Sequence, residues 1–139
     1  TAALRAAAAC DPSDAAALTN LGSHLITAGD AAGAVDALRE AVARTGPARP
    51  KEYAEANFNL GIALRRAGDV DGAARAYQAT LSVQPTHADA HLNLGVALQA
   101  SRPDVAVRAF EAARAPGHAQ STQIRAAIDA IKQQRQQEQ

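Results

Sequence analysis

The sequence predicts an all-α protein built from stacked, antiparallel helix-turn-helix hairpins. Three observations lead to this prediction. Hydrophobic residues make up 47% of the chain but aromatic residues only 3%, a composition that favours closely packed, alanine-rich helices over a core of large rings. The tripeptide Asn-Leu-Gly occurs three times, each time followed by leucine three residues later. Between the copies, apolar residues recur at spacings of three and four, the period of one helix face.

The underlying repeat is 34 residues long. Gly61 and Gly95 are 34 residues apart, whereas Gly22 and Gly61 are 39 apart. The five extra residues fall within 46–51, where two prolines and a glycine predict a loop between repeats. Self-similarity at this period is typical of helical solenoids.

We expect the chain to open with residues 1–13 as the second helix of a truncated preceding repeat. In this segment Leu4 and Ala7 match the apolar pattern of the later second helices, and Pro12 closes the unit. A lone cysteine, Cys10, cannot form an internal disulfide, and its simplest role is that of a small residue at a helix end. Cysteine usage weakly favours a cytoplasmic location and otherwise leaves the compartment unknown.

Three repeats follow, over residues 14–50 with their extended loop at 46–51, over 54–87 and over 88–120. Each contains Asn-Leu-Gly in a first helix, followed by a second helix with one apolar face. The residues of that face are Ala34, Leu38 and Ala41, then Ala73, Tyr77 and Thr80, then Ala106, Phe110 and Ala113.

The turns inside the hairpins carry capping residues. Ala-Gly-Asp occurs at 28–30 and 67–69, where glycine can adopt the left-handed conformation and aspartate can cap the next helix. The third turn, at 100–104, lacks glycine, but Pro103 suits the first turn of a helix.

Residues 121–139 predict a capping helix and a polar tail. Ile124, Ala127, Ile128 and Ile131 share one helix face, after Ser121 or Thr122 as the N-cap. No second helix is expected after them, because the remaining residues are mostly glutamine. Such a polar end is what a solenoid needs at its terminus.

This pattern resembles the tetratricopeptide repeat family, in which Leu-Gly stands early in the first helix and a proline closes the repeat. The matching pairs are Leu21-Gly22, Leu60-Gly61 and Leu94-Gly95, and Pro85 closes the second repeat. The third repeat lacks its closing proline. The large aromatic that the family usually carries early in the first helix is replaced by Leu18, Asn57 and His91. The resemblance implies an α-solenoid wound as a right-handed superhelix, with first helices lining its concave side.

On that concave side the resemblance places a row of asparagines, namely Asn20, Asn59 and Asn93. An amide side chain both donates and accepts hydrogen bonds, so the row can bind the backbone of an extended peptide. The competing interpretation is that each amide bonds a neighbouring helix or turn.

Other first-helix residues are candidates for the same peptide-binding surface. The apolar ones either anchor a peptide side chain or pack between adjacent first helices; they are Phe58, Ile62, Leu92 and Val96. Arg65 and Arg66 end a first helix, where they complement the helix dipole or, as the less favoured alternative, grip an acidic group. Some family members hold the carboxylate of chaperone tails with lysine and arginine, but Asp89 and Asn93 occupy those positions here. Neutral or basic ligands are therefore favoured.

Catalysis, cofactors and metals are not expected. The chain has no phosphate-binding loop or nucleophile elbow. His87 and His91 have the i, i+4 spacing of a metal pair, but no third ligand is evident. Fourteen basic and fourteen acidic residues give zero formal charge, which argues against nucleic acid and anionic membranes as partners.

Three functional hypotheses follow. The leading one is a scaffold or adaptor that binds a protein or peptide in the concave groove. The second is the substrate-binding arm of a larger enzyme, because similar asparagine rows occur in the repeat arm of O-linked N-acetylglucosamine transferases. The third is a structural subunit that self-assembles end to end.

Overall fold

A computed structural model describes residues 15–114 and 121–138. In these two stretches the chain forms seven α-helices and no strand, so the all-α prediction is confirmed. The helices fall into two compact units, residues 1–85 and 86–139. The helix expected within residues 1–13, with Cys10 and Pro12, lies outside the described residues.

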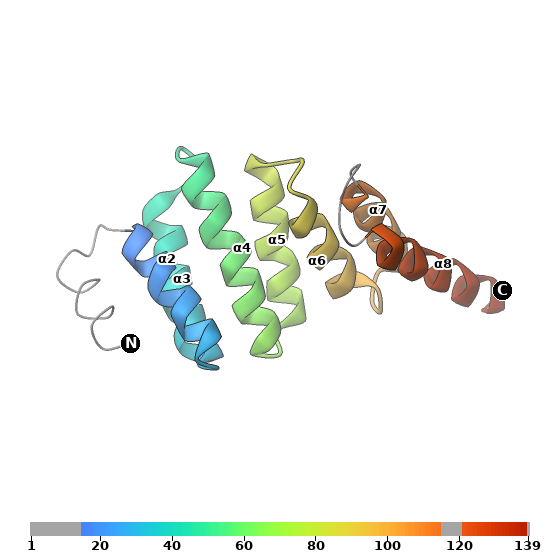
Figure 1. The fold of residues 1–139 in the computed structure, drawn as a ribbon, viewed down its shortest axis with the longest axis horizontal. Helices are drawn as coiled ribbons and strands as arrows, with labels where there is room; N and C mark the ends of the chain where they lie inside the picture. The colour runs from blue at the N-terminus through green and yellow to red at the C-terminus, as the bar shows by residue number, and fades with distance from the viewer. Residues whose placement is uncertain (1–14, 115–120, 139) are drawn as a thin grey trace. The chain divides into compact units, whose positions relative to one another are not determined.

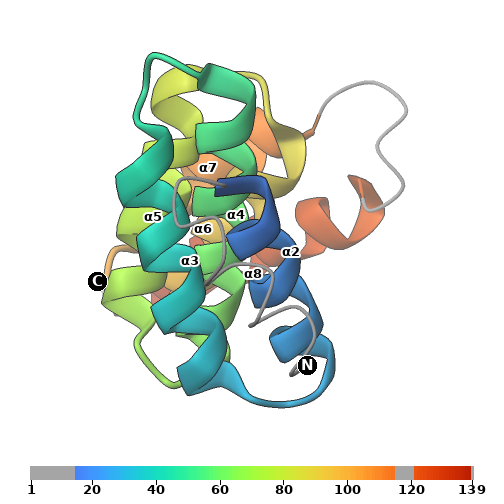
Figure 2. The same cartoon turned by 90° about the vertical axis from the view of Figure 1, so that its left-hand side faces the viewer.

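The first unit consists of two helical hairpins (Figure 1). Its helices are α2 (Ala15–Thr27), α3 (Ala31–Thr45), α4 (Pro50–Arg66) and α5 (Val70–Val83). Within each hairpin the two helices pack along their length, and α4 also contacts both helices of the preceding hairpin. Figure 2 views this unit with the α2–α3 hairpin toward the reader. First helices therefore pack on first helices, as stacked repeats require.

The two hairpin corners of this unit are built alike, as the sequence predicted. Gly29 and Gly68 have φ values of 85° and 91°, a conformation that costs glycine little because it has no Cβ. Asp30 then caps α3 by accepting a hydrogen bond from the Gly33 amide at 2.9 Å, and Asp69 caps α5 in the same way. Each cap satisfies a helix N–H that would otherwise lack a partner.

The repeated glycine in each first helix lies under a large side chain of the second helix. A Cβ on Gly61 would come within 2.5 Å of the Tyr77 ring, and one on Gly95 within 2.7 Å of the Phe110 ring. Leu38 covers Gly22 in the same manner. The glycine therefore lets the two helices of a hairpin approach closely by making room for a large buried side chain of the second helix.

The core lies between the two helices of each hairpin. All nine residues predicted for the apolar face of the second helices are buried. Four further alanines of these helices are buried beside them, namely Ala37, Ala74, Ala76 and Ala109. Leu38, Tyr77 and Phe110 fill the spaces above the glycines, with alanines on either side that let the helices come together. Alanine abundance is thus explained by close helix packing.

The loop after α3 is shorter than expected. Pro50 and Lys51 were assigned to the loop, but α4 begins at Pro50, so the loop spans only residues 46–49. Proline is favoured at the first helical position because its fixed φ suits a helix and its missing N–H has no partner there. Gly46, with a φ of 67°, ends α3.

The second unit contains α6 (Ala88–Leu98), α7 (Pro103–Ala113) and α8 (Ser121–Gln137). The first two form a hairpin, and α8 packs on α7. Pro103 is the first residue of α7, as predicted. Ile124, Ile128 and Ile131 are buried on one face of α8, which supports its role as a capping helix. The glutamine-rich segment expected to be a tail is helical as far as Gln137.

Candidate peptide-binding surfaces

Each first helix packs with one face and leaves the other face outside the core. In α4 the buried residues include Asn57, Leu60, Gly61 and Leu64. The opposite face carries the predicted site residues, because positions three and four apart lie on one side of a helix. Phe58, Asn59 and Ile62 are half-buried there, and Arg65 and Arg66 are exposed.

Phe58, which is half-buried on α4, also packs against the core of its hairpin. Its ring centroid lies 5.9 Å from that of Tyr77, and the planes are tilted by 53°. Tilted aromatic pairs at this separation attract one another. Phe58 therefore extends the core of its hairpin, and only part of its ring is left for a ligand.

Arg66 is committed to contacts within its own unit. Its Nη1 donates a hydrogen bond to the carbonyl oxygen of Ile26 at 3.2 Å, in the last turn of α2. This carbonyl lies at the negative end of a helix dipole, where a cation is stabilising. Arg66 therefore complements a helix dipole, as one interpretation predicted, but the dipole is that of α2 and not that of its own helix α4. Arg65 is exposed.

Asn20 lies on the exposed face of α2, together with Ser23 and His24. In the same unit Asn59 is half-buried on α4, and α2 contacts α4 directly. Two of the three predicted amides thus belong to adjacent first helices. Asn93, the third, belongs to the second unit.

In the second unit, three of the predicted residues line one hollow. Leu92, Asn93 and Val96 share a face of α6 and border a cavity of about 270 Å³. The other lining residues come from the end of α6 and from α7 and α8; they are Gln99, Phe110, Gln123, Ile124 and Ala127. Val96 is 39% exposed, and the other exposed large hydrophobic residue in the described part of the chain is Val70.

The chemistry of this hollow is mostly apolar with amides at its edge. Phe110 and Ile124 are almost fully buried and form its floor, while Leu92 and Asn93 are half-buried. An apolar cleft with a few polar groups is the usual form of a binding site for a side chain or small ligand. The arrangement can hold an apolar group and hydrogen-bond the chain that carries it.

The lining residues from α7 and α8 were not among the predicted site residues. A signal for them was present: in the repeat frame α8 occupies the place of the next first helix, so its residues border the exposed face of α6.

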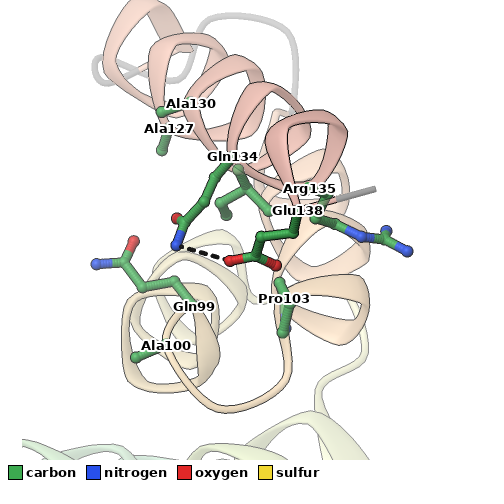
Figure 3. A pocket seen from close by; sticks show the side chains of 9 residues that line it. Gln99, Ala100, Pro103, Ala127, Ala130, Gln134, Arg135 and Glu138 are labelled. Carbon is green, nitrogen blue, oxygen red and sulfur yellow. Dashed lines mark hydrogen bonds between the residues drawn. The ribbon is translucent and has the colours of Figure 1, made fainter.

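A second hollow of about 450 Å³ lies between α8 and the turn joining α6 to α7 (Figure 3). Gln99, Pro103, Gln134 and Glu138 are among its lining residues, and Gln134 Nε2 donates a hydrogen bond to Glu138 Oε1 at 3.5 Å. None of the predicted peptide-binding residues lines this hollow.

The histidine pair has a local structural role. His87 is the N-cap of α6, where its Nδ1 accepts a hydrogen bond from the amide of Ala90 at 3.0 Å. Within residues 15–114 and 121–138, no group of three His, Cys, Asp or Glu side chains comes close enough to hold a metal ion. In the same stretches no helix combines the length and apolar character needed to span a bilayer.

Comparisons with known proteins identify the repeat. A family profile described as tetratricopeptide repeat matches residues 1–53 and 58–121. The comparison with curated proteins found no match. A crystal structure of MamA superimposes with a TM-score of 0.83 over 95% of this chain and 74% of that chain, at 23% sequence identity. A second crystal structure of MamA protein gives a TM-score of 0.71 over 80% and 58% of the two chains, at 30% identity.

The MamA structures are similar in fold, and the family profile covers most of the sequence. The described helices form the packed helical hairpins expected of such repeats. The protein is therefore an all-α solenoid that belongs to the tetratricopeptide repeat family, whose repeats generally act as protein-interaction scaffolds rather than as enzymes.

Proposed function

We propose that this protein is a scaffold that binds an extended peptide segment of a partner protein along the exposed faces of its first helices. The observation that carries the proposal is the hollow of about 270 Å³ in the second unit, bordered by Leu92, Asn93 and Val96. An exposed valine beside a buried phenylalanine floor is what a side-chain pocket needs, and a purely solvated helix face would carry charges instead.

In this proposal the hollow takes an apolar side chain of the peptide, and Asn93 bonds the peptide backbone beside it. Burying one leucine-sized side chain contributes about 1.5 to 3 kcal/mol. A hydrogen bond from the amide adds about 1 kcal/mol. A single anchor of this kind gives weak binding, so contacts on further repeats are needed for useful affinity.

The first unit carries candidate peptide contacts of its own. Asn59 and Ile62 lie on the exposed face of α4, and Asn20 on that of the neighbouring α2. Amides bond any peptide backbone, and the apolar positions select side chains. Because Arg66 already bonds Ile26, we assign the peptide no salt bridge to it.

The test is a selection of peptides from a random display library against the whole chain, followed by affinity measurement. We expect selected peptides to carry an apolar residue, and the double variant Asn93→Ala, Val96→Asp to bind them about tenfold more weakly or worse. Asn59→Ala tests the contribution of the first unit in the same way. Arg108→Ala, an exposed site on α7 away from these faces, is the matched control.

Each variant is checked for unchanged helical content and unfolding midpoint. If peptides bind the Asn93→Ala, Val96→Asp variant as tightly as the wild type, the hollow is not the binding site. If Arg108→Ala weakens binding equally, the ligand contacts another face of the second unit.

A further inference from the structure

A separate hollow lies in the first unit, where α3, α4 and α5 meet. Its volume is about 230 Å³, and it is lined by Arg39, Asn57, Leu60, Leu64, Gly72, Arg75 and Ala76. Asn57, Leu60 and Leu64 belong to the packing face of α4. The hollow is thus on the side of the second helices, away from the peptide-binding residues proposed above.

The hollow exists because three of its lining residues, Asn57, Gly72 and Ala76, have short side chains or none. Asn57 stands where the other first helices have Leu18 and His91, and it is only 3% exposed. Gly72 has no side chain, and a Cβ there would collide with the Asp69 carboxylate that caps α5. Ala76 completes the α5 wall. No side chain of the described unit fills the space.

Two arginines border this hollow from different helices. Arg39 comes from α3 and Arg75 from α5, and both side chains are exposed. Among the described residues neither forms an ion pair, whereas Arg44, also on α3, pairs with Glu40. Two guanidinium groups beside low-dielectric walls create a positive potential focused on the space between them.

The floor suits a short side chain with a polar end. Leu60 and Leu64 give apolar contact, and the Asn57 amide is held in place because its Nδ2 donates to the Tyr53 carbonyl at 3.0 Å. A guanidinium presents N–H groups in a flat fork that matches a carboxylate. A glutamate or aspartate fits both features, since its methylene stem meets the leucines and its carboxylate meets the arginines.

We propose that Arg39 and Arg75 bind an acidic side chain of a partner protein, with Asn57, Leu60 and Leu64 forming the seat for its stem. This is a second interaction surface, independent of the peptide-binding faces of the first helices. It gives the scaffold a way to contact a partner from the side of its second helices.

The test uses small probes and the whole protein. N-acetyl-glutamate N-methylamide, the corresponding glutamine compound and inorganic phosphate are titrated while backbone amide signals of residues 72–76 are followed by NMR. We expect saturable shifts with the glutamate probe in the millimolar range, as for one exposed charged contact. The glutamine probe and phosphate should bind about tenfold more weakly or worse, and added salt should weaken the glutamate probe.

Two variants test the two parts of the site separately. Arg39→Gln with Arg75→Gln removes both charges and should lower affinity about tenfold or more. Asn57→Leu keeps the arginines but fills the hollow with the residue found in the first repeat, and it should also abolish saturable binding. Arg108→Gln with Arg114→Gln, two exposed arginines of the second unit, is the matched control and should bind the probe as the wild type does.

Unfolding midpoints establish that each variant is folded. Equal binding of the glutamine probe, or tighter binding of phosphate, would overturn the assignment to an acidic side chain. Undiminished binding by the double arginine variant or by Asn57→Leu would overturn the site itself.

Discussion

At the scale of single residues, the decisive contact is a glycine facing a large buried side chain. Tyr77 is fully buried, and the place where a Gly61 Cβ would stand is 2.5 Å from its ring. The ring cannot move away easily, because Phe58 packs against it at a centroid distance of 5.9 Å. The glycine is therefore required by packing, although glycine inside a helix is unfavourable by itself.

Because packing requires a glycine where helix propensity disfavours one, the packing argument predicts whether replacing Gly61 raises or lowers the free energy of unfolding. In an exposed helix, Gly→Ala stabilises by about 1 kcal/mol. At Gly61 we expect Gly61→Ala to destabilise by about 1 to 2 kcal/mol instead, because overpacking against Tyr77 outweighs the helix propensity of alanine. Urea unfolding measures the difference. Gln78→Ala, next to Tyr77 but exposed, is the control and should change stability by less than about 0.5 kcal/mol; a stabilised Gly61→Ala would contradict the packing argument.

The residues that could be predicted from the sequence are those whose roles are local. Asp30 and Asp69 were recognised because a cap bonds an amide three residues away, and Gly29 and Gly68 because a left-handed turn favours glycine. Arg66 could not be assigned, since its hydrogen bond reaches Ile26, forty residues earlier in the chain. Such a contact depends on how two hairpins stack.

At the scale of helices, the N-caps decide where each second helix begins. Asp69 bonds the Gly72 amide at 2.9 Å, and the turn before it uses Gly68 at a φ of 91°. The second helix of the third hairpin begins differently, because Pro103 is the first residue of α7 and no side chain caps the helix. Proline replaces the cap because it leaves one fewer N–H to satisfy.

We therefore expect Asp69→Ala to lower the free energy of unfolding by about 1 kcal/mol. Asp69→Asn should retain most of that stability, because an amide oxygen can accept the same hydrogen bond from Gly72. Denaturant unfolding of the three proteins gives the comparison, with Asp71→Ala, an exposed acid in the first turn of α5 that makes no cap, as the control. Equal losses for Asp69→Ala and Asp69→Asn would show that the side-chain hydrogen bond is unimportant.

Helix ends were the part of the elements hardest to predict. Pro47 and Pro50 were both assigned to a loop, yet Pro50 begins α4. A proline is found both after the end of a helix and at the start of one, and only the surrounding structure distinguishes the two cases. The glutamine-rich end of α8 was expected to be a tail, but glutamine is a good helix former, and two ion pairs join α8 to α7. Those pairs join Lys132 to Glu111 and Arg135 to Asp104.

At the scale of the whole molecule, the candidate site was predicted in outline only. The exposed faces of the first helices followed from the repeat, and Leu92, Asn93 and Val96 do border one hollow. The hollow around Asn57 could not be predicted, because it depends on three helices from two hairpins leaving a space between them. When one repeat has a shorter side chain at a position where other repeats have a longer one, either the helices move closer together or a cavity remains. The spacing of the surrounding helices determines which of the two occurs.

The outer face of α8 also bears on how the molecule associates. Its apolar residues, Ile124, Ile128 and Ile131, are buried, while Arg125, Asp129 and the other residues of the opposite face are exposed. A polar face of this kind covers the apolar surface that another repeat would otherwise use for stacking. We therefore expect that the exposed face of α8 takes no part in the end-to-end association of the third functional hypothesis.

We accordingly expect the protein to be a monomer of 14.3 kDa whose mass by light scattering does not change with concentration. The matched variant carries Asp129→Leu and Gln133→Leu, which place two large apolar side chains on the exposed face of α8 and should make the mass rise with concentration. A wild-type mass that rises in the same way would favour a self-assembling subunit over a monomeric scaffold. The variant serves as the positive control, because its mass has to rise if the measurement detects association through the exposed face of α8.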